Sequence, residues 1–348
     1  MIRRLAILCV AFGLCSAGAL AQPVANAIEE KEWAAYKTRF VEDRGRVVDD
    51  GNGGISHSEG QGYGMLLAWL AGNRADFERI WSFTRTNLML RDDGLFVWRW
   101  DPRTQPAVSD PNNASDGDIL IAYALALAGM GWNEDRYTAQ AREIAGTLAR
   151  TALFEWEGKL LVRPGTAGFD AEDSPDGPVV NLSYWVYEAL PVLERLAPDG
   201  DWPELRRSGL EVLREAAFSD RNLPPDWLSV AAEARPADGF PARFSYDAMR
   251  IPLYMIRASE DDSPLLDRMR QGMTGESGGL ALVDLETGQV DEELMDAGYR
   301  IIPALIDCVL DGTPVPDDLL GFEPTLYYPS TLHLLALAHV RKERPECL

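Results

Sequence analysis

Three short segments of the sequence place a carboxylate among small or aromatic residues, in a pattern suited to acid–base chemistry. Glu59 lies in the run SEGQGYGM, Asp116 in NASDGD and Asp247 in SYDAMRIP. Two carboxylates can cleave a glycosidic bond when one protonates the leaving oxygen and the other attacks the sugar or activates water. These three acids are therefore the candidate catalytic groups.

Glycines surround the first of these acids. Gly60, Gly62 and Gly64 fall in the first turns of an expected helix, where each costs roughly 1 kcal/mol relative to alanine. A helix start this rich in glycine is explained if a bulky ligand approaches the backbone closely. The structural alternative is that Glu59 merely complements the helix dipole, but this leaves the glycines without a reason.

The other two acids are ambiguous when each is taken alone. Asp116 and Asp118 open an expected helix and can form an ordinary N-terminal cap cluster, in which Asp118, lying further into the helix, is the structural member. Arg250 follows Asp247 by three residues, so it can lie on the same helical face and hold that carboxylate ionised. This arrangement suits a catalytic base and equally suits a surface ion pair.

Aromatic residues near these segments add the surface that a sugar needs, because sugar rings stack on aromatic faces. The candidates in loop-like or helix-start contexts are Trp98, Trp100, Tyr184, Trp185, Tyr246, Tyr327 and Tyr328. Any single one of them can instead belong to the core, and helical spacing assigns Trp69 and Trp81 there. The aromatics therefore strengthen the carbohydrate interpretation only as a group.

Helical periodicity dominates the chain and must supply the frame for these groups. Eleven helices are expected, with a twelfth that the pattern does not place; weak strand signals occur near 95–100, 159–163 and 278–283. Three of these helices show apolar residues at helical spacing, near 65–70, 77–88 and 137–148. The other eight are expected at about 29–45, 117–130, 180–196, 202–217, 247–258, 261–274, 292–309 and 328–341. The chain has no repeat of fixed period, which lowers the odds of an open solenoid. A closed α/α barrel needs no repeated sequence and collects its loops at one end.

The first 21 residues are expected to be a secretory signal peptide, and residues 22–348 to form one domain. Arg3 and Arg4 precede an apolar run that ends at Ala19-Leu20-Ala21, a signal-peptidase site. A membrane anchor is the alternative, but the run is short and diluted by small residues. No membrane insertion is expected after removal of the leader.

Charge and cysteine content narrow the partners. The formal net charge of −22 disfavours nucleic acid and anionic membranes. The sequence has three histidines and no CxxC or HExxH motif, so nothing points to a metal or another cofactor. After loss of the leader, Cys308 and Cys347 remain, and both a disulfide and a buried free thiol at Cys308 stay open.

Together the segments resemble glycoside hydrolase family 8. SEGQGYGM is similar to the family's catalytic-acid motif, NASDGDILIAYALALA to its signature around a second acid, and SYDAMRIP to the segment that carries the base in its cellulases and xylanases. NLSY at 181–184 is similar to an Asn-Pro-Ser-Tyr segment, with Leu182 in place of proline, and VWRWD at 97–101 to an aromatic sugar platform. The match covers most of the chain, in order.

The resemblance implies an all-α (α/α)6 barrel with few short strands in its loops, inversion at the anomeric carbon and no cofactor. It implies Glu59 as the proton donor, Asp247 as the base that activates water, and Asp116 as a residue that binds and helps distort the sugar at the cleavage point. Residues that match positions in the sugar groove are Trp98, Tyr184, Tyr246 and Arg250, joined by Tyr327 or its neighbour Tyr328.

The implied activity is that of a secreted endo-β-1,4-glucanase acting on cellulose or cello-oligosaccharides. The chain resembles the periplasmic endoglucanases that accompany bacterial cellulose synthesis, which implies a periplasmic location and association with a cellulose synthase complex. Within the family, β-1,4-xylanase, chitosanase and lichenase are alternatives, and Asp247 counts against chitosanase because those enzymes carry their base elsewhere. A non-catalytic glucan-binding barrel and a helical scaffold for partner proteins are the non-enzyme alternatives; the first requires loss of Glu59 or Asp247, and both are in place.

Overall fold

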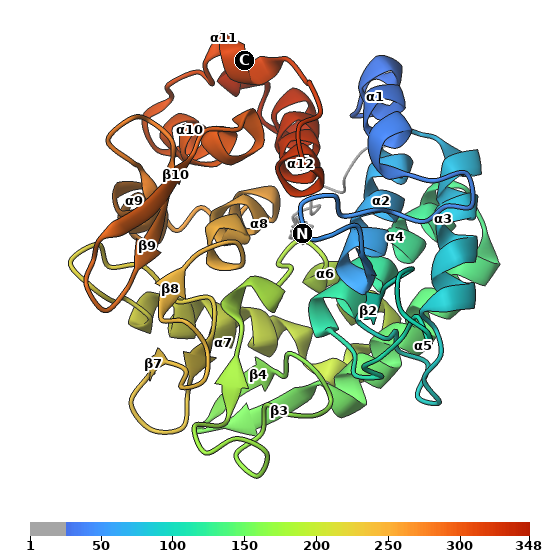
Figure 1. The fold of residues 1–348 in the computed structure, drawn as a ribbon, viewed down its shortest axis with the longest axis horizontal. Helices are drawn as coiled ribbons and strands as arrows, with labels where there is room; N and C mark the ends of the chain where they lie inside the picture. The colour runs from blue at the N-terminus through green and yellow to red at the C-terminus, as the bar shows by residue number, and fades with distance from the viewer. Residues whose placement is uncertain (1–25) are drawn as a thin grey trace, which may run out of the picture.

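The protein is an (α/α)6 barrel built from the twelve α helices of the described chain (Figure 1). The computed structural model describes residues 26–348, so the expected signal peptide, residues 1–21, lies outside the described residues. The helices are α1 Glu30–Phe40, α2 Ser58–Leu70, α3 Arg74–Asn87, α4 Ser115–Gly131, α5 Asp135–Thr151, α6 Leu190–Leu196, α7 Trp202–Glu215, α8 Ile251–Arg257, α9 Ser263–Met273, α10 Ala297–Asp311, α11 Asp317–Leu320 and α12 Tyr327–Glu343. None of the described helices is long and apolar enough to span a membrane.

Helices near the centre of the ring differ in character from those around it. In Figure 1, α2, α4, α6, α8 and α12 surround the centre of the view, and α1, α3, α5, α7 and α9 lie further out. Every residue of α4 from Ser115 to Gly129 is buried, whereas α3 and α5 bury one side only. A helix that is apolar all round belongs in a core, and amphipathic helices cover it. Trp69 and Trp81 are buried, as their spacing predicts.

The glycines of α2 serve helix packing. A Cβ atom on Gly62 would lie 2.7 Å from the Cβ of Leu120 in α4, and one on Gly64 would lie 2.6 Å from the Cγ2 of Val47. A Cβ on Gly117, in α4, would likewise collide with the hydroxyl of Ser58. The expectation that these glycines admit a ligand is therefore wrong at Gly62 and Gly64. Their consequence is that α2 and α4 approach closely, which brings the two helix starts that carry Glu59 and Asp116 together.

Short antiparallel strands lie in the loops and form no closed sheet. Two pairs are β1 Ser56–His57 with β2 Arg99–Trp100, and β3 Leu153–Trp156 with β4 Lys159–Val162. Two three-stranded sheets are β5 Val179–Val180, β6 Leu228–Ser229 and β7 Arg235–Pro236, and β8 Arg243–Phe244, β9 Leu280–Asp284 and β10 Val290–Leu294. The first pair joins the segment before Glu59 to the segment after Trp98, with Ser56 opposite Trp100.

Four expected helices differ from the structure. The helix expected over 29–45 ends at Phe40, and Val41 instead pairs with Val47 in an isolated antiparallel bridge. The helix expected from residue 292 begins at Ala297, because residues 290–294 pair with β9 as a strand. The helix expected over 180–196 is divided into the 3₁₀ turn η1 Leu182–Tyr184 and α6, and that over 247–258 into η3 Ala248–Arg250 and α8. Two further 3₁₀ turns are η2 Pro198–Gly200 and η4 Pro345–Cys347.

Contacts between the two ends of the described chain close the ring. The hydroxyls of Tyr36 in α1 and Thr331 in α12 lie 2.9 Å apart. Arg341 of α12 donates two hydrogen bonds, of 2.6 and 2.8 Å, to the Glu32 carboxylate. A disulfide joins Cys308 of α10 to Cys347 of η4, which resolves the alternatives that the sequence leaves open.

A buried ion pair crosses the interior of the ring. Arg257, at the end of α8, donates hydrogen bonds of 2.8 and 2.7 Å to the two carboxylate oxygens of Glu188, which lies just before α6. It donates another, of 2.7 Å, to the carbonyl of Leu335 in α12. The Tyr123 hydroxyl of α4 also donates to Glu188, at 3.5 Å. One cation and one anion thus join three helices and the segment that leads into α6.

Candidate active site

A cleft of about 440 Å³ collects residues from distant parts of the chain. Its lining includes Asp49, His57, Glu59, Trp98, Asp116, Tyr184, Tyr246, Asp247, Arg250, Tyr299, Leu326 and Tyr328. Seven of the eight site residues expected from the sequence lie in this lining; Tyr327 does not. The carboxylates come from the starts of α2 and α4 and from the turn before η3.

Arg250 lies among the three candidate carboxylates. Its Nη1 atom is 2.6 Å from Oε1 of Glu59 and 3.6 Å from Oδ1 of Asp247, and its Nη2 atom is 2.8 Å from Oδ2 of Asp116. The Arg250 side chain is only 3% exposed. The sequence predicts its contact with Asp247, which is the longest of the three, and misses the other two.

The cluster has more acids than cations. Burial, followed by the negative charge of Glu59, raises the pKa of Asp116 to about 8 in spite of Arg250. Burial also raises the pKa of Asp247 above its usual value, against the opposing effect of Arg250. Like charges in a buried site cannot all ionise without a large free-energy cost. At neutral pH the cluster therefore retains a proton.

His57 caps α2 and lies near Oε2 of Glu59, the carboxylate oxygen that is not paired with Arg250. Its Nδ1 atom accepts a 2.9 Å hydrogen bond from the Gly60 amide and lies 3.5 Å from Oε2 of Glu59. Its Nε2 atom lies 3.3 Å from Oδ2 of Asp49. Burial lowers the pKa of His57, but Asp49 and Glu59 outweigh it and the net shift is upward. The sequence predicts a helix start here but not that a histidine caps it.

Asp247 is held on both carboxylate oxygens. Its Oδ2 atom accepts a 2.9 Å hydrogen bond from Nδ2 of Asn181, and its Oδ1 atom faces Arg250. Asn181 belongs to the NLSY segment and also accepts the Ser183 amide, which fixes its own side chain. The Asp247 side chain is 30% exposed, so water can reach it from the cleft.

A buried carboxylate next to the cluster, Asp118, has a structural role, as expected. It accepts hydrogen bonds from the Phe96 amide, at 2.9 Å, and from Nδ2 of Asn113, at 2.8 Å. Burial raises its pKa to about 7 against these two hydrogen bonds. The bonds fasten the start of α4, which carries Asp116, to the loop that leads to Trp98.

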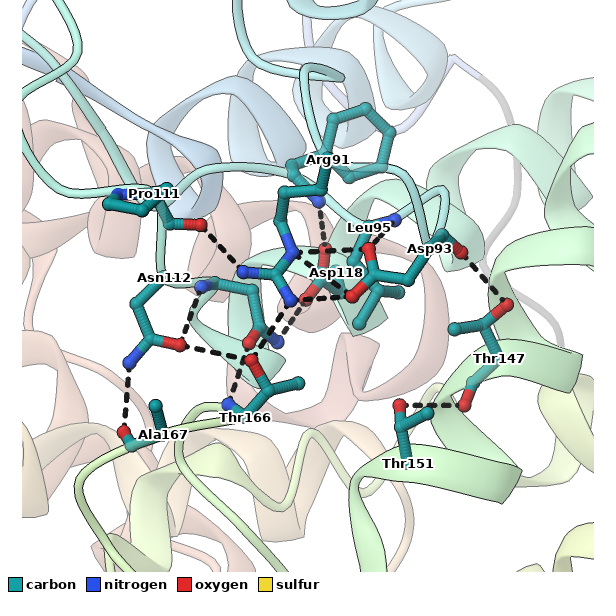
Figure 2. Close-up of polar contacts among 12 residues, drawn as sticks. Arg91, Asp93, Leu95, Pro111, Asn112, Asp118, Thr147, Thr151, Thr166 and Ala167 are labelled. Carbon is teal, nitrogen blue, oxygen red and sulfur yellow. Dashed lines mark hydrogen bonds and ion pairs between the residues drawn. The ribbon is translucent and has the colours of Figure 1, made fainter.

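Arg91 extends this network along the loops beside the cleft (Figure 2). It donates hydrogen bonds to the Pro111 carbonyl, at 2.6 Å, and to the Thr166 hydroxyl, at 2.9 Å, and it pairs with Asp93. Thr166 in turn lies 3.1 Å from Oδ1 of Asn112. Three loops are thereby held at fixed positions around the aromatic platform.

The Trp98 platform is tied to the segment that carries the candidate acid. The Trp98 amide donates to the Asn112 carbonyl, and its own carbonyl accepts from the Ser58 amide at 3.0 Å. Its indole Nε1 atom donates to Asp110 at 2.8 Å. A flat apolar surface therefore stands next to Glu59 in a fixed orientation.

Three tyrosines form another part of the lining. Tyr246, Tyr299 and Tyr328 have ring centroids 6.3–6.4 Å apart. The Tyr328 hydroxyl donates to the Tyr246 carbonyl and accepts from Nη1 of Arg250 at 3.2 Å. The structure thus places Tyr328 in the cleft, whereas Tyr327 is fully buried against Phe40 and His57. Tyr299 is not among the aromatic candidates from the sequence, although Asp-Ala-Gly-Tyr at a helix start is a context like those of the other aromatics.

Comparison with known proteins finds similar chains among the glycosyl hydrolases. A family model described as "Glycosyl hydrolases family 8" matches residues 2–292. The chain is 42% identical over 248 residues to a probable endoglucanase of Novacetimonas hansenii, covering 70% of this chain and 71% of that protein. It is 35% identical to an endoglucanase of Cellulomonas uda, covering 67% of this chain and 64% of that protein. The solved structure of endo-beta-1,4-glucanase CMCax from Acetobacter xylinum superposes with a TM-score of 0.80 at 35% identity, covering 93% of this chain and 99% of the other.

Proposed function

The chain belongs to glycosyl hydrolase family 8, and from this premise we propose that it is an endo-β-1,4-glucanase that cleaves internal bonds of cellulose with inversion. The observation that carries the proposal is the cluster of Glu59, Asp116 and Asp247 around Arg250 in an aromatic-lined cleft. Relatives named endoglucanase, at 42% and 35% identity, support β-1,4-glucan as the substrate.

Glu59 and Asp247 divide the proton transfers of the reaction. Glu59 gives its proton to the glycosidic oxygen as the bond from that oxygen to the anomeric carbon breaks. Asp247 takes a proton from a water molecule, whose oxygen attacks the anomeric carbon from the opposite face and yields the α-anomer. The Glu59 carboxylate left behind is stabilised by Arg250, 2.6 Å away. Solvent then returns a proton to Glu59 and removes one from Asp247.

Asp116 holds the sugar whose bond is cleaved. The Asp116 carboxyl group, whose pKa is raised to about 8, can form a hydrogen bond with a sugar hydroxyl in either protonation state, so the proton that the cluster retains is free to reside on Glu59. The other oxygen of Asp116 stays on Arg250 at 2.8 Å. The interaction therefore fixes the ring against the catalytic pair, and binding energy can be used to distort it toward the transition state. Trp98 and Tyr184, with Tyr246 and Tyr328, provide stacking surfaces for neighbouring glucose units.

The setting that we propose is the periplasm, where the enzyme trims nascent glucan beside a cellulose synthase complex. The Cys308–Cys347 disulfide supports an oxidising compartment. The expected leader over residues 1–21 agrees with export, and the acidic net charge of −22 agrees with a neutral polysaccharide as partner.

The test is product formation by the purified protein from carboxymethylcellulose, xylan and chitosan side by side. Proton NMR on a soluble cello-oligosaccharide follows the first anomer released. Cleavage of the glucan with initial release of the α-anomer is expected. Initial release of the β-anomer would overturn inversion, and cleavage of xylan or chitosan alone would replace the substrate. No cleavage of any of the three would leave a glucan-binding barrel as the better description.

A further inference from the structure

Asp226 lies directly behind the turn that carries Asp247. Its Oδ1 atom accepts a 2.9 Å hydrogen bond from the Ser245 amide and a 2.8 Å hydrogen bond from the Ala248 amide. These two amides bracket Tyr246 and Asp247 in the chain, so a single oxygen atom fixes both ends of the turn.

The support beneath this oxygen is rigid. Buried Pro224 and Pro225 precede Asp226, and their rings fix the backbone angle φ. The Asp226 amide donates to the Arg243 carbonyl at 2.8 Å. Strand β6, which pairs on both sides, begins two residues later at Leu228. Because the backbone of Asp226 is held rigidly, its carboxyl oxygen can keep the turn of residues 245–248 in one position.

The charges that face Asp226 are those of Asp247 and Arg250, both from the turn itself and the η3 segment after it. Burial, followed by the charge of Asp247, raises the pKa of Asp226 to about 7. A large fraction of Asp226 is thus uncharged near neutral pH. Its role as a hydrogen-bond acceptor does not depend on a full negative charge, and asparagine, which keeps one oxygen acceptor, is a matched replacement.

We propose that Asp226 is a positioning residue for the catalytic base. By holding the Ser245 and Ala248 amides on one oxygen, it keeps the Asp247 carboxylate between Asn181 and Arg250, where it can activate water. The inference rests on the proposed function, because it takes Asp247 to be the base. It makes Asp226 part of the support of the active site, although Asp226 does not line the cleft.

The experiment compares kcat and KM of Asp226→Ala and Asp226→Asn on a soluble cello-oligosaccharide, with Asp247→Asn as the reference. Asp226→Ala removes the acceptor, and we expect kcat to fall by about tenfold to 100-fold, because misplacement by about 1 Å can have such an effect, while KM changes by less than about twofold. Asp226→Asn keeps the acceptor and is expected to recover most of that loss.

Asp284→Ala is the matched control. Asp284 also accepts backbone amides, those of Glu286 and Thr287, but in the β9–β10 turn outside the cleft, so its replacement is expected to leave kcat unchanged. If Asp226→Ala does not fold, Asp226→Glu serves instead: it keeps the charge but displaces the acceptor by one methylene, and we again expect a loss of kcat.

The outcomes separate the two levels of the proposal. An Asp247→Asn enzyme with normal turnover would remove the base assignment and, with it, the proposed function. If Asp247→Asn is inactive but the Asp226→Ala or Asp226→Glu enzyme keeps the wild-type kcat, only the positioning role is overturned. Equal losses in Asp226→Ala and Asp226→Asn, or a loss confined to KM, would overturn it as well.

Discussion

Two buried arginines in this barrel, Arg250 and Arg257, show how the same kind of contact can serve different ends. Each side chain is 3% exposed and each is hydrogen-bonded to a carboxylate. Arg257 has one anionic partner, Glu188, bound through both oxygens. Arg250 has three, Glu59, Asp116 and Asp247, on three different segments.

The two arginines differ in the net charge of their surroundings, and this difference distinguishes a structural ion pair from a candidate catalytic cluster. The pair of Arg257 with Glu188 is neutral as a whole, and its remaining contacts are a backbone carbonyl and a tyrosine hydroxyl. The Arg250 cluster is over-acidic, so it retains a proton, and it opens into the cleft. A buried ion pair alone is therefore weak evidence for function, whereas unmatched buried acids with raised pKa values are a stronger sign.

The largest effect is expected when the acid or the base of the over-acidic cluster is neutralised. Glu59→Gln and Asp247→Asn should each lower kcat by about 10²–10⁴-fold, because each removes one proton transfer, while glucan binding measured by calorimetry persists. Azide should not rescue activity with net retention. A Glu59→Gln enzyme with near-normal turnover would remove Glu59 from the acid role and break the comparison.

Disruption of the neutral Arg257–Glu188 pair should lower stability and leave kcat unchanged. Glu188→Ala leaves Arg257 buried without its counter-ion, and breaking a buried pair in this way typically lowers the free energy of unfolding by about 3–5 kcal/mol. Denaturant unfolding measures this loss, and kcat of the folded enzyme at 25 °C should stay close to wild type. A selective loss of kcat in a stable Glu188→Ala protein would contradict the division between the two arginines.

Asp116→Asn should move activity and stability in opposite directions. We expect kcat to fall by about 10–100-fold, with residual activity, because Glu59 and Asp247 remain. The pKa of Asp116 is about 8 in the fold and about 4 when unfolded, so its ionisation lowers stability as the pH rises from about 4 to about 8. The variant should therefore melt higher than wild type at pH 8 and show less difference at pH 5. A wild-type rate, or a lower melting temperature at pH 8, would refute this.

The ionisation of Asp118 is expected to change stability with pH in the same direction but by less, although here the asparagine variant is the less stable protein. The pKa of Asp118 is about 7 in the fold and about 4 when unfolded, so this residue too stabilises the fold at low pH and loses that contribution as the pH rises through 7. Asp118→Asn gives up one of two hydrogen bonds, worth about 1 kcal/mol. Its deficit in unfolding free energy should be largest near pH 5 and narrow by pH 8. A deficit that widens with pH would show that the ionised form is the stabilising one.

The sequence predicts features that depend on neighbouring residues better than it predicts contacts between distant segments. The helical stripes, the three acids and the contact of Arg250 with Asp247 are local in sequence, and the structure has them. The contacts of Arg250 with Glu59 and Asp116 cross more than 100 residues, so no spacing rule could indicate them. The packing partners of Gly62 and Gly64 likewise lie in other segments, so the local sequence does not show that these glycines serve helix packing.

Two other differences between prediction and structure concern where one helix begins and whether one segment is a helix or a strand. Tyr327 and Tyr328 are neighbours at the start of α12, and successive residues of a helix point about 100° apart. An error of one residue in where the helix begins therefore exchanges the buried ring for the one in the cleft. Residues 290–294 are rich in acids, and the sequence favours a helix there. They form a strand because they pair with β9, so tertiary pairing outweighs local propensity.

The contacts between α1 and α12 also bear on the stage of folding at which the cleft is complete. Glu59 is made early and Tyr328 late, and both line one cleft. The contacts that close the ring, Tyr36 with Thr331 and Glu32 with Arg341, join residues about 300 positions apart. Contacts of such separation form late, because the loop between them must be closed first. A chain still emerging from the ribosome thus has Glu59 but no complete cleft, so we expect hydrolysis to begin only when α12, the final long helix, has docked.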